Sequence, residues 1–134
     1  MLSTADIAVY VGGLILGLVL THVVIAVISD GRMSTPGTLA LAAIATFVAA
    51  FMYVRRAAIA QRRYAQYFLH VIAYLTVNAS FLLHALVMFS AGRADEIADS
   101  WRGVLFAMPL TWAIGLFLHT VGTVSSRGFE HVEV

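Results

Sequence analysis

The chain divides into four long runs without Asp, Glu or Arg, separated by short clusters of charged residues. The runs cover residues 7–29, 33–54, 64–92 and 103–126. Each exceeds the roughly 20 residues that a helix needs to cross about 30 Å of hydrocarbon. No strand alternation is visible, and helices satisfy their own backbone polar groups in lipid. The pattern predicts an all-α polytopic membrane protein in the lipid bilayer, with one four-helix transmembrane bundle over residues 1–134.

Composition narrows the chemistry. Hydrophobic residues make up 61% of the 134 residues and charged residues 11%, and the chain contains neither cysteine nor lysine. Without cysteine it cannot hold disulfides, iron–sulfur clusters or covalently attached c-type haem. Without lysine it cannot form a retinal Schiff base or use lysine in covalent catalysis. We expect no catalytic side chain and no nucleic-acid partner.

The charged clusters predict an orientation. Four arginines and no acid separate the second and third runs, and a fifth arginine follows the fourth run: Arg55, Arg56, Arg62, Arg63 and Arg127. The other side mixes three arginines with four acids: Arg32, Arg93, Arg102, Asp30, Asp95, Glu96 and Asp99. By the positive-inside rule both termini are cytoplasmic. We therefore expect an integral protein of a prokaryotic cytoplasmic membrane.

Four histidines lie inside the runs at two matched depths. His70 follows Arg63 by seven residues, and His119 precedes Arg127 by eight. His22 precedes Asp30 by eight residues, and His84 precedes Arg93 by nine. A histidine in hydrocarbon is costly and tends to mark function. Four histidines at two common levels indicate a common function. His131 differs, because it lies in a polar tail beside Glu130 and Glu133 and is expected to be solvated.

Helical geometry pairs these histidines. His70 and His84 are fourteen residues apart, which places them on one helix face within about 40° and about 21 Å apart along the axis. The alternating direction of the spans brings His119 to the level of His70, and His22 to the level of His84. Neutral imidazole is a good iron ligand. We predict two haem b groups per chain, with His70/His119 and His22/His84 as axial ligands of the haem irons.

This arrangement resembles that of dihaem membrane cytochromes b, in which two stacked haems carry electrons across the bilayer. The resemblance is limited to the four histidines. It implies transmembrane electron transfer. Quinone is a candidate partner because it is soluble in the membrane, and a quinone-linked oxidoreductase is then a candidate activity. A homodimer or a partner redox subunit is also compatible with it.

The C-terminal half, residues 61–124, resembles a second family, the two-transmembrane domain found beside bacterial sensor kinases. The residues that carry this resemblance are Arg62, Arg63, Tyr67, Phe68, Leu69, His70, Tyr74, Val77, Asn78, Trp101, Pro109, Trp112, Ile114, Gly115, Leu116 and His119. Ala113 stands where the family pattern has glycine, and the pattern has no counterpart of His22 or His84, so that pair rests on geometry alone. The resemblance therefore supports His70 and His119 as a unit.

Three alternatives stay open. The histidines can serve as interhelical hydrogen-bond donors, which contribute only about 0.6 kcal/mol on average. The chain can be a signalling or scaffold module without redox chemistry. It can also be a histidine-lined metal conduit, although Met33, Met52, Met88 and Met108 form no repeated ligand motif.

Packing and anchoring raise three further expectations. In a simple cyclic bundle the third helix is diagonal to the first, so the haem pairing needs a different helix order or a homodimer. Gly13 and Gly17 form a small-xxx-small pair that brings helices close. Tyr53, Tyr64, Tyr67 and Trp101 are expected to anchor the ends of the spans at the membrane interface,.

Overall fold

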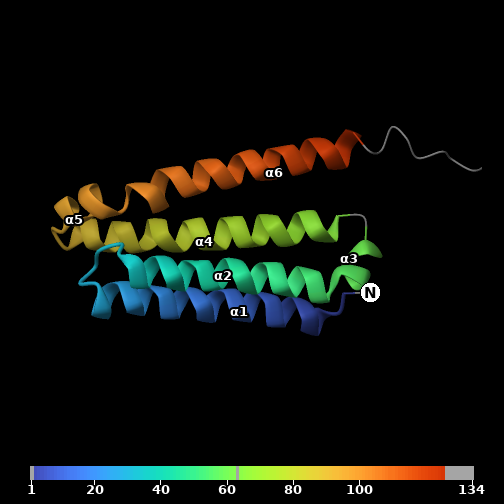
Figure 1. Cartoon of the computed structure of the whole chain (residues 1–134), viewed down its shortest axis with the longest axis horizontal. Coiled ribbons are helices and arrows are strands. Elements are labelled where there is room, and N and C mark those ends of the chain that lie inside the picture. Colours follow the sequence, from blue (N-terminus) through green and yellow to red (C-terminus); the bar gives the residue numbers. More distant parts are fainter. Residues whose placement is uncertain (1, 63, 126–134) are drawn as a thin grey trace, which may run out of the picture.

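The computed structural model describes residues 2–62 and 64–125, which form four long helices and two short ones (Figure 1). Helix α1 covers Thr4–Val23 and continues as a π-helical turn over Val24–Ile28. Helix α2 covers Thr35–Val54 and α4 covers Ala65–Ser90. A second π-helical turn, Gly103–Ala107, leads into α6 at Met108–Ser125.

The predicted all-α architecture is confirmed. Four helical segments are long and apolar enough to cross a membrane: residues 4–28, 35–54, 65–90 and 103–122. They agree with the predicted spans to within a few residues at the limits that lie in the described chain. The two short helices, α3 at Arg56–Ala60 and α5 at Ala94–Ser100, were not predicted. They occupy the charged connections, where no hydrophobic run marks a helix.

Local capping explains why α1 begins earlier than expected. The Ser3 hydroxyl accepts a hydrogen bond from the Asp6 amide at 3.1 Å, and the Asp6 carboxylate accepts one from the Ser3 amide at 2.9 Å. This reciprocal pair satisfies amides that the first turn leaves without helical partners. Asp6 also pairs with Arg55 at 2.8 Å. The negative charge of Asp6 in the first turn of α1 is therefore balanced by Arg55 at the end of α2.

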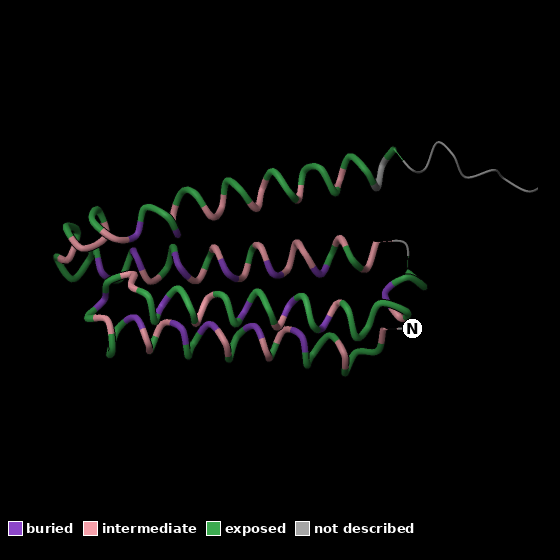
Figure 2. The backbone as a smooth tube through the Cα atoms, viewed as in Figure 1, coloured by how far each residue is buried: buried purple, intermediate pink, exposed green. Residues whose placement is uncertain are grey.

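The helix order differs from a simple cyclic bundle. Helix α1 packs against both α2 and α4, and α6 packs against α4. In the described residues α2 and α4 have no more than marginal contact. Figure 2 shows that buried positions recur along α1, α2 and α4, whereas α6 is mostly exposed. The first and third spans are therefore direct neighbours, which removes the difficulty of pairing His22 with His84.

Close packing of α1 on α2 depends on the two glycines of α1. A Cβ atom at Gly13 would lie 2.3 Å from the Phe47 ring, and one at Gly17 would lie 3.1 Å from the Ile44 side chain. The expectation that these glycines bring helices close is confirmed. A further long-range contact joins α1 to α4, where the Tyr10 hydroxyl donates to the Leu69 carbonyl at 2.9 Å.

Candidate functional site

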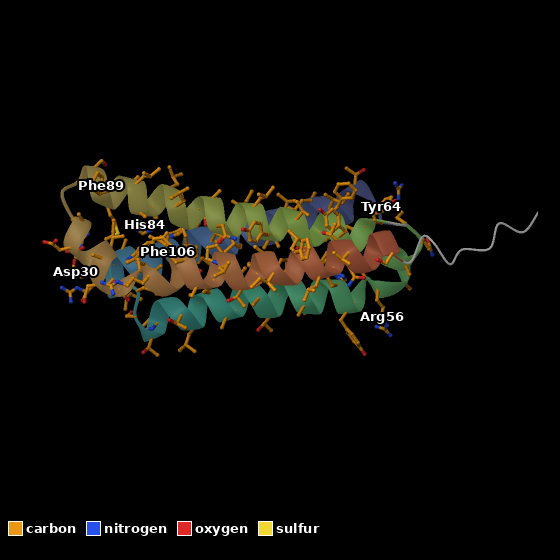
Figure 3. The ribbon with its side chains drawn as sticks, turned by 90° about the horizontal axis from the view of Figure 1, so that it is seen from above. Asp30, Arg56, Tyr64, His84, Phe89 and Phe106 are labelled. Carbon is orange, nitrogen blue, oxygen red and sulfur yellow. The ribbon has the colours of Figure 1, made fainter. Side chains whose placement is uncertain are left out.

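The two ends of the bundle differ in chemistry. We call them the α3 end, which carries the N-terminus and the arginines between α2 and α4, and the α5 end, which carries α5 and the connection between α1 and α2. Figure 3 shows Arg56 and Tyr64 at the α3 end and Asp30, His84 and Phe89 at the α5 end. The structure places His70 beside His119 toward the α3 end, and His22 beside His84 toward the α5 end.

At the α5 end the two imidazoles contact each other directly. The Nδ1 atoms of His22 and His84 are 2.8 Å apart, which is a hydrogen bond whose donor depends on the tautomers,. The ring centroids are 4.8 Å apart, with the planes at 66°. Nε2 of His22 is buried and has no hydrogen-bond partner among the described residues. The pair therefore joins α1 to α4 and leaves one buried imidazole nitrogen unsatisfied.

Two aromatic rings enclose this pair. Phe81 lies with its ring centroid 4.8 Å from that of His22, and Trp101 lies 4.9 Å from His84. Both aromatic side chains are 0% exposed. The expectation that Trp101 anchors the chain at the membrane interface is not met, because the connection after α5 turns the indole inward onto the histidine pair.

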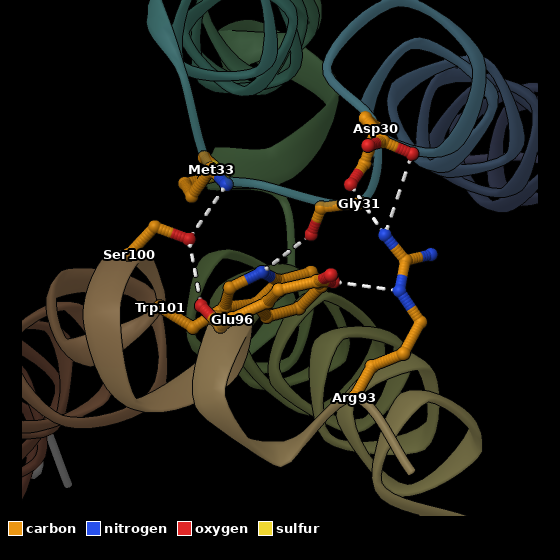
Figure 4. Close-up of polar contacts among 7 residues, drawn as sticks. All are labelled: Asp30, Gly31, Met33, Arg93, Glu96, Ser100 and Trp101. Carbon is orange, nitrogen blue, oxygen red and sulfur yellow. Dashed lines mark hydrogen bonds and ion pairs between the residues drawn. The ribbon is translucent and has the colours of Figure 1, made fainter. Parts of the chain in front are cut away.

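A polar network fixes Trp101 and α5 in place (Figure 4). The indole N–H of Trp101 donates to the Gly31 carbonyl at 2.9 Å, and the Met33 amide donates to the Ser100 hydroxyl at 3.1 Å. Arg93 contacts Glu96 at 2.6 Å and also binds the Asp30 carbonyl.

The loop in this network requires an unusual backbone. Asp30 and Gly31 adopt positive φ angles of 48° and 76°. This region favours glycine and tolerates aspartate. The turn presents the Gly31 carbonyl to the indole, so the α1–α2 connection and α5 together close the α5 end.

At the α3 end the histidine pair is more open. The ring centroids of His70 and His119 are 5.1 Å apart, with the planes at 58°. A hollow of about 270 Å³ lies beside them, lined by His70, Trp112, Gly115, Leu116 and His119. A Cβ atom at Gly115 would meet no atom within 4 Å. Helix α6 diverges from α4 toward this end (Figure 1), and Gly115 and His119 are exposed, so the hollow opens on that side.

The α3-end pair supplies the donor types of a b-type haem, but its ring centroids, 5.1 Å apart, would also have to separate to admit an iron ion with bonds of about 2.0 Å to both rings,. Its donors are two imidazoles on packed helices, and such side chains commonly hold iron cofactors in helical bundles. The hollow and the missing side chain at Gly115 leave space beside the rings. Apolar Leu116 and aromatic Trp112 suit the body of a macrocycle.

The α5-end pair does not fit a haem in this arrangement. Two imidazoles on opposite sides of one metal ion have nitrogen atoms about 4 Å apart, since each bond is about 2.0 Å. The observed separation is 2.8 Å. Phe81 and Trp101 fill the space that a macrocycle would need. A second haem on His22 and His84 stays a prediction that requires α1 and α4 to separate.

A larger cavity lies at the α3 end, between the starts of α1 and α4. It has a volume of about 620 Å³, within the range of about 300–1,000 Å³ that is common for small-molecule pockets,. Its walls are mostly apolar, and the three polar side chains are those of Thr4, Arg62 and Tyr64. The other lining residues are Leu2, Ile7, Ala65, Phe68, Leu69 and Ile72. Sequence reasoning placed Tyr64 at the membrane interface and gave it a place beside a quinone pocket only as the less favoured alternative. The other lining residues were not foreseen, because the cavity forms between helices distant in the chain.

Some expectations concern residues that lie outside the described ranges, namely Arg63, Arg127 and His131. The ligand roles of His22, His70, His84 and His119 stay predictions, as do both family resemblances. Comparison of the chain with protein-family models, with curated proteins and with solved structures finds no match.

Proposed function

We propose that this chain is a b-type membrane cytochrome that holds one haem between α4 and α6 and takes part in electron transfer. The observation that supports this proposal is the pair of imidazoles from packed helices beside an open hollow. His70 and His119 lie 5.1 Å apart between ring centroids, and Gly115 leaves free space next to them. Ionisable side chains at membrane depth are costly, so a pair at one level favours a cofactor role.

Each residue of the hollow has a role in the proposal. His70 and His119 supply the two imidazole ligands from separate helices. Trp112 and Leu116 provide the apolar wall that keeps water away, and Gly115 provides room. A haem held by these two histidines would supply one-electron redox chemistry. The chain would therefore determine the position, the ligands and the burial of the haem, while the redox chemistry belongs to the cofactor.

The cavity of about 620 Å³ suggests a redox partner. It lies on the same end of the bundle as His70, and its wall includes Leu69 and Ile72 of α4. A helix with its side chains is about 10–12 Å wide, so this cavity and the histidine pair lie within about one helix diameter of each other. Apolar walls with a guanidinium and two hydroxyls suit a membrane-soluble quinone, whose carbonyls accept hydrogen bonds. Quinone is the partner that we propose.

Orientation is part of the proposal. The α3 end carries Arg55, Arg56 and Arg62, and the α5 end carries acids beside its arginines. The positive-inside rule then places the α3 end, the haem and the quinone cavity toward the cytoplasm. A second haem at the α5 end would extend electron transfer across the whole bilayer, but it requires the separation of α1 and α4 described above.

The haem content of the purified protein tests the proposal. We expect a red protein with one b-type haem per chain and a reduced-minus-oxidised difference spectrum. The variants His70→Ala and His119→Ala should each lose the haem, and the tail variant His131→Ala is the matched control that should keep it. A colourless wild-type protein from haem-replete cells would contradict the proposal and favour the signalling or scaffold alternative.

A further inference from the structure

Another hollow lies at the α3 end, where helix α3 connects α2 to α4 (Figure 1). It has a volume of about 270 Å³. Its lining comes from the end of α2, from α3 and from the start of α4 with the residues before it: Met52, Arg56, Ile59, Ala60, Arg62 and Gln66. We call it the arginine hollow. It shares Arg62 with the larger cavity of about 620 Å³, and its other lining residues are different.

The arginine hollow lies at the level where the spans leave the hydrocarbon. The second span ends at residue 54 and the third begins at residue 65. Arg56 and Arg62 lie just outside these two limits. The polar headgroups of a bilayer form the layer directly outside its hydrocarbon core. The two arginines are therefore at the depth of lipid headgroups.

No acid neutralises these two arginines in the described part of the chain. Arg55 pairs with Asp6 at 2.8 Å. Arg56 and Arg62 form no ion pair with a described residue, and the lining of the hollow contains no carboxylate. One N–H of Arg56 donates to the Tyr53 carbonyl at 2.9 Å, and the guanidinium lies 4.4 Å over the Tyr53 ring. Since a guanidinium has five N–H donors, Arg56 keeps donors for an anion.

We propose that the arginine hollow binds the phosphate group of an anionic phospholipid. Basic pockets between transmembrane helices bind the headgroups of such lipids. Arginine donates paired N–H bonds to phosphate oxygens, and the Gln66 side chain adds amide donors,. Met52 and Ile59 give the hollow an apolar wall, which suits the glycerol and the first carbons of the acyl chains.

Charge and shape distinguish an anionic lipid from other sources of phosphate. A phosphatidylcholine headgroup carries its own positive charge, which two arginines without a compensating acid repel. Free phosphate has no apolar part that gains from contact with Met52 and Ile59. The occupant that suits the whole hollow is therefore a lipid of net negative charge. The proposal does not depend on the haem, on the quinone or on the orientation.

Lipid binding by the full-length purified protein tests this site. Delipidated protein in an uncharged detergent is titrated with phosphatidylglycerol, and bound lipid is counted by native mass spectrometry. We expect one tightly bound phosphatidylglycerol per chain, and at least fivefold weaker binding of phosphatidylcholine. Arg56→Gln should weaken phosphatidylglycerol binding about fivefold, the factor that one basic residue near anionic lipid supplies. Arg56→Lys keeps the charge and should weaken it less.

Arg55→Gln is the matched control. It removes the same charge from the neighbouring position, but Arg55 does not line the hollow and already pairs with Asp6. Its affinity for phosphatidylglycerol should equal that of the wild type. Equal losses in Arg55→Gln and Arg56→Gln would overturn the proposal, because binding would then follow the overall surface charge. Equal binding of the two lipids would overturn it as well.

Two further measurements separate the alternatives. Inorganic phosphate in large excess should leave the lipid bound, and displacement would assign the hollow to free phosphate and overturn the proposal. Arg56 does not line the quinone cavity, so Arg56→Gln should keep its haem. Circular dichroism checks folding, and if Arg56→Gln loses helicity, Gln66→Leu takes its place and should also weaken lipid binding. A colourless wild type that still selects phosphatidylglycerol would refute the haem and support this site.

Discussion

The indole ring of Trp101 lies against the imidazole ring of His84, with centroids 4.9 Å apart and planes at 70°. The two residues belong to different segments, since His84 is on α4 and Trp101 follows α5. The Trp101 indole also donates its N–H to Gly31, in the connection between α1 and α2. One side chain therefore links the histidine pair to both connections at the α5 end.

Trp101→Phe should loosen the α5 end while preserving an aromatic ring. The substitution removes the hydrogen bond to the Gly31 carbonyl, and a single such bond contributes about 1 kcal/mol to the free energy of unfolding. We expect faster hydrogen exchange of the α5 amides, measured by mass spectrometry, and a lower melting temperature. Trp112→Phe is the control, and its α5 amides should exchange at the wild-type rate. Unchanged exchange in Trp101→Phe would mean that other contacts hold α5.

Gly13→Leu should disrupt the packing of α1 on α2. Even a Cβ atom at this position would lie 2.3 Å from the Phe47 ring, whereas one at Gly12 would meet nothing within 4 Å. Overpacking of this kind typically costs about 1–3 kcal/mol. Thermal unfolding in detergent should show a lower melting temperature for Gly13→Leu than for the control Gly12→Leu. Equal melting temperatures would contradict the close packing of these helices.

Gly115→Leu should block the proposed haem without unfolding the protein. The new side chain enters the hollow beside His70 and His119, where a Cβ atom meets no neighbour within 4 Å. We expect a protein with wild-type circular dichroism and a strongly reduced haem-to-protein ratio. Gly122→Leu is the matched control, because Gly122 also has free space but does not line the hollow. Full haem content in Gly115→Leu would argue against a macrocycle in this hollow.

Single cysteines should reveal the orientation. The chain has no cysteine of its own, so Gln61→Cys and Ala98→Cys each introduce one reactive thiol. Both positions are exposed, Gln61 at the α3 end and Ala98 in α5. The positive-inside rule predicts that an impermeant thiol reagent labels Ala98→Cys in intact cells, and labels Gln61→Cys only after the cells are opened. The reverse pattern would exchange the two faces but leave both histidine pairs as they are.

The helices and their approximate limits were predictable because each depends on a local property. A helix in lipid must be long, apolar and internally hydrogen-bonded. A long run of uncharged residues indicates such a helix. The depth of a histidine was likewise predictable, since each residue adds a fixed rise of about 1.5 Å along the axis. The short helices α3 and α5 were missed because they lie in charged connections without a hydrophobic run. A tertiary contact supports α5, since the Met33 amide donates to the Ser100 hydroxyl.

The sequence by itself determined the membrane class, the four spans and the common levels of His70 with His119 and of His22 with His84. Only the tertiary structure decided that α1 packs beside α4, and that one pair is in direct contact while the other borders a hollow. The physical reason is that depth follows from counting residues along one helix, whereas the gap between two rings depends on how two helices meet. That meeting is governed by contacts between distant residues, such as Tyr10 with Leu69 and Trp101 with Gly31.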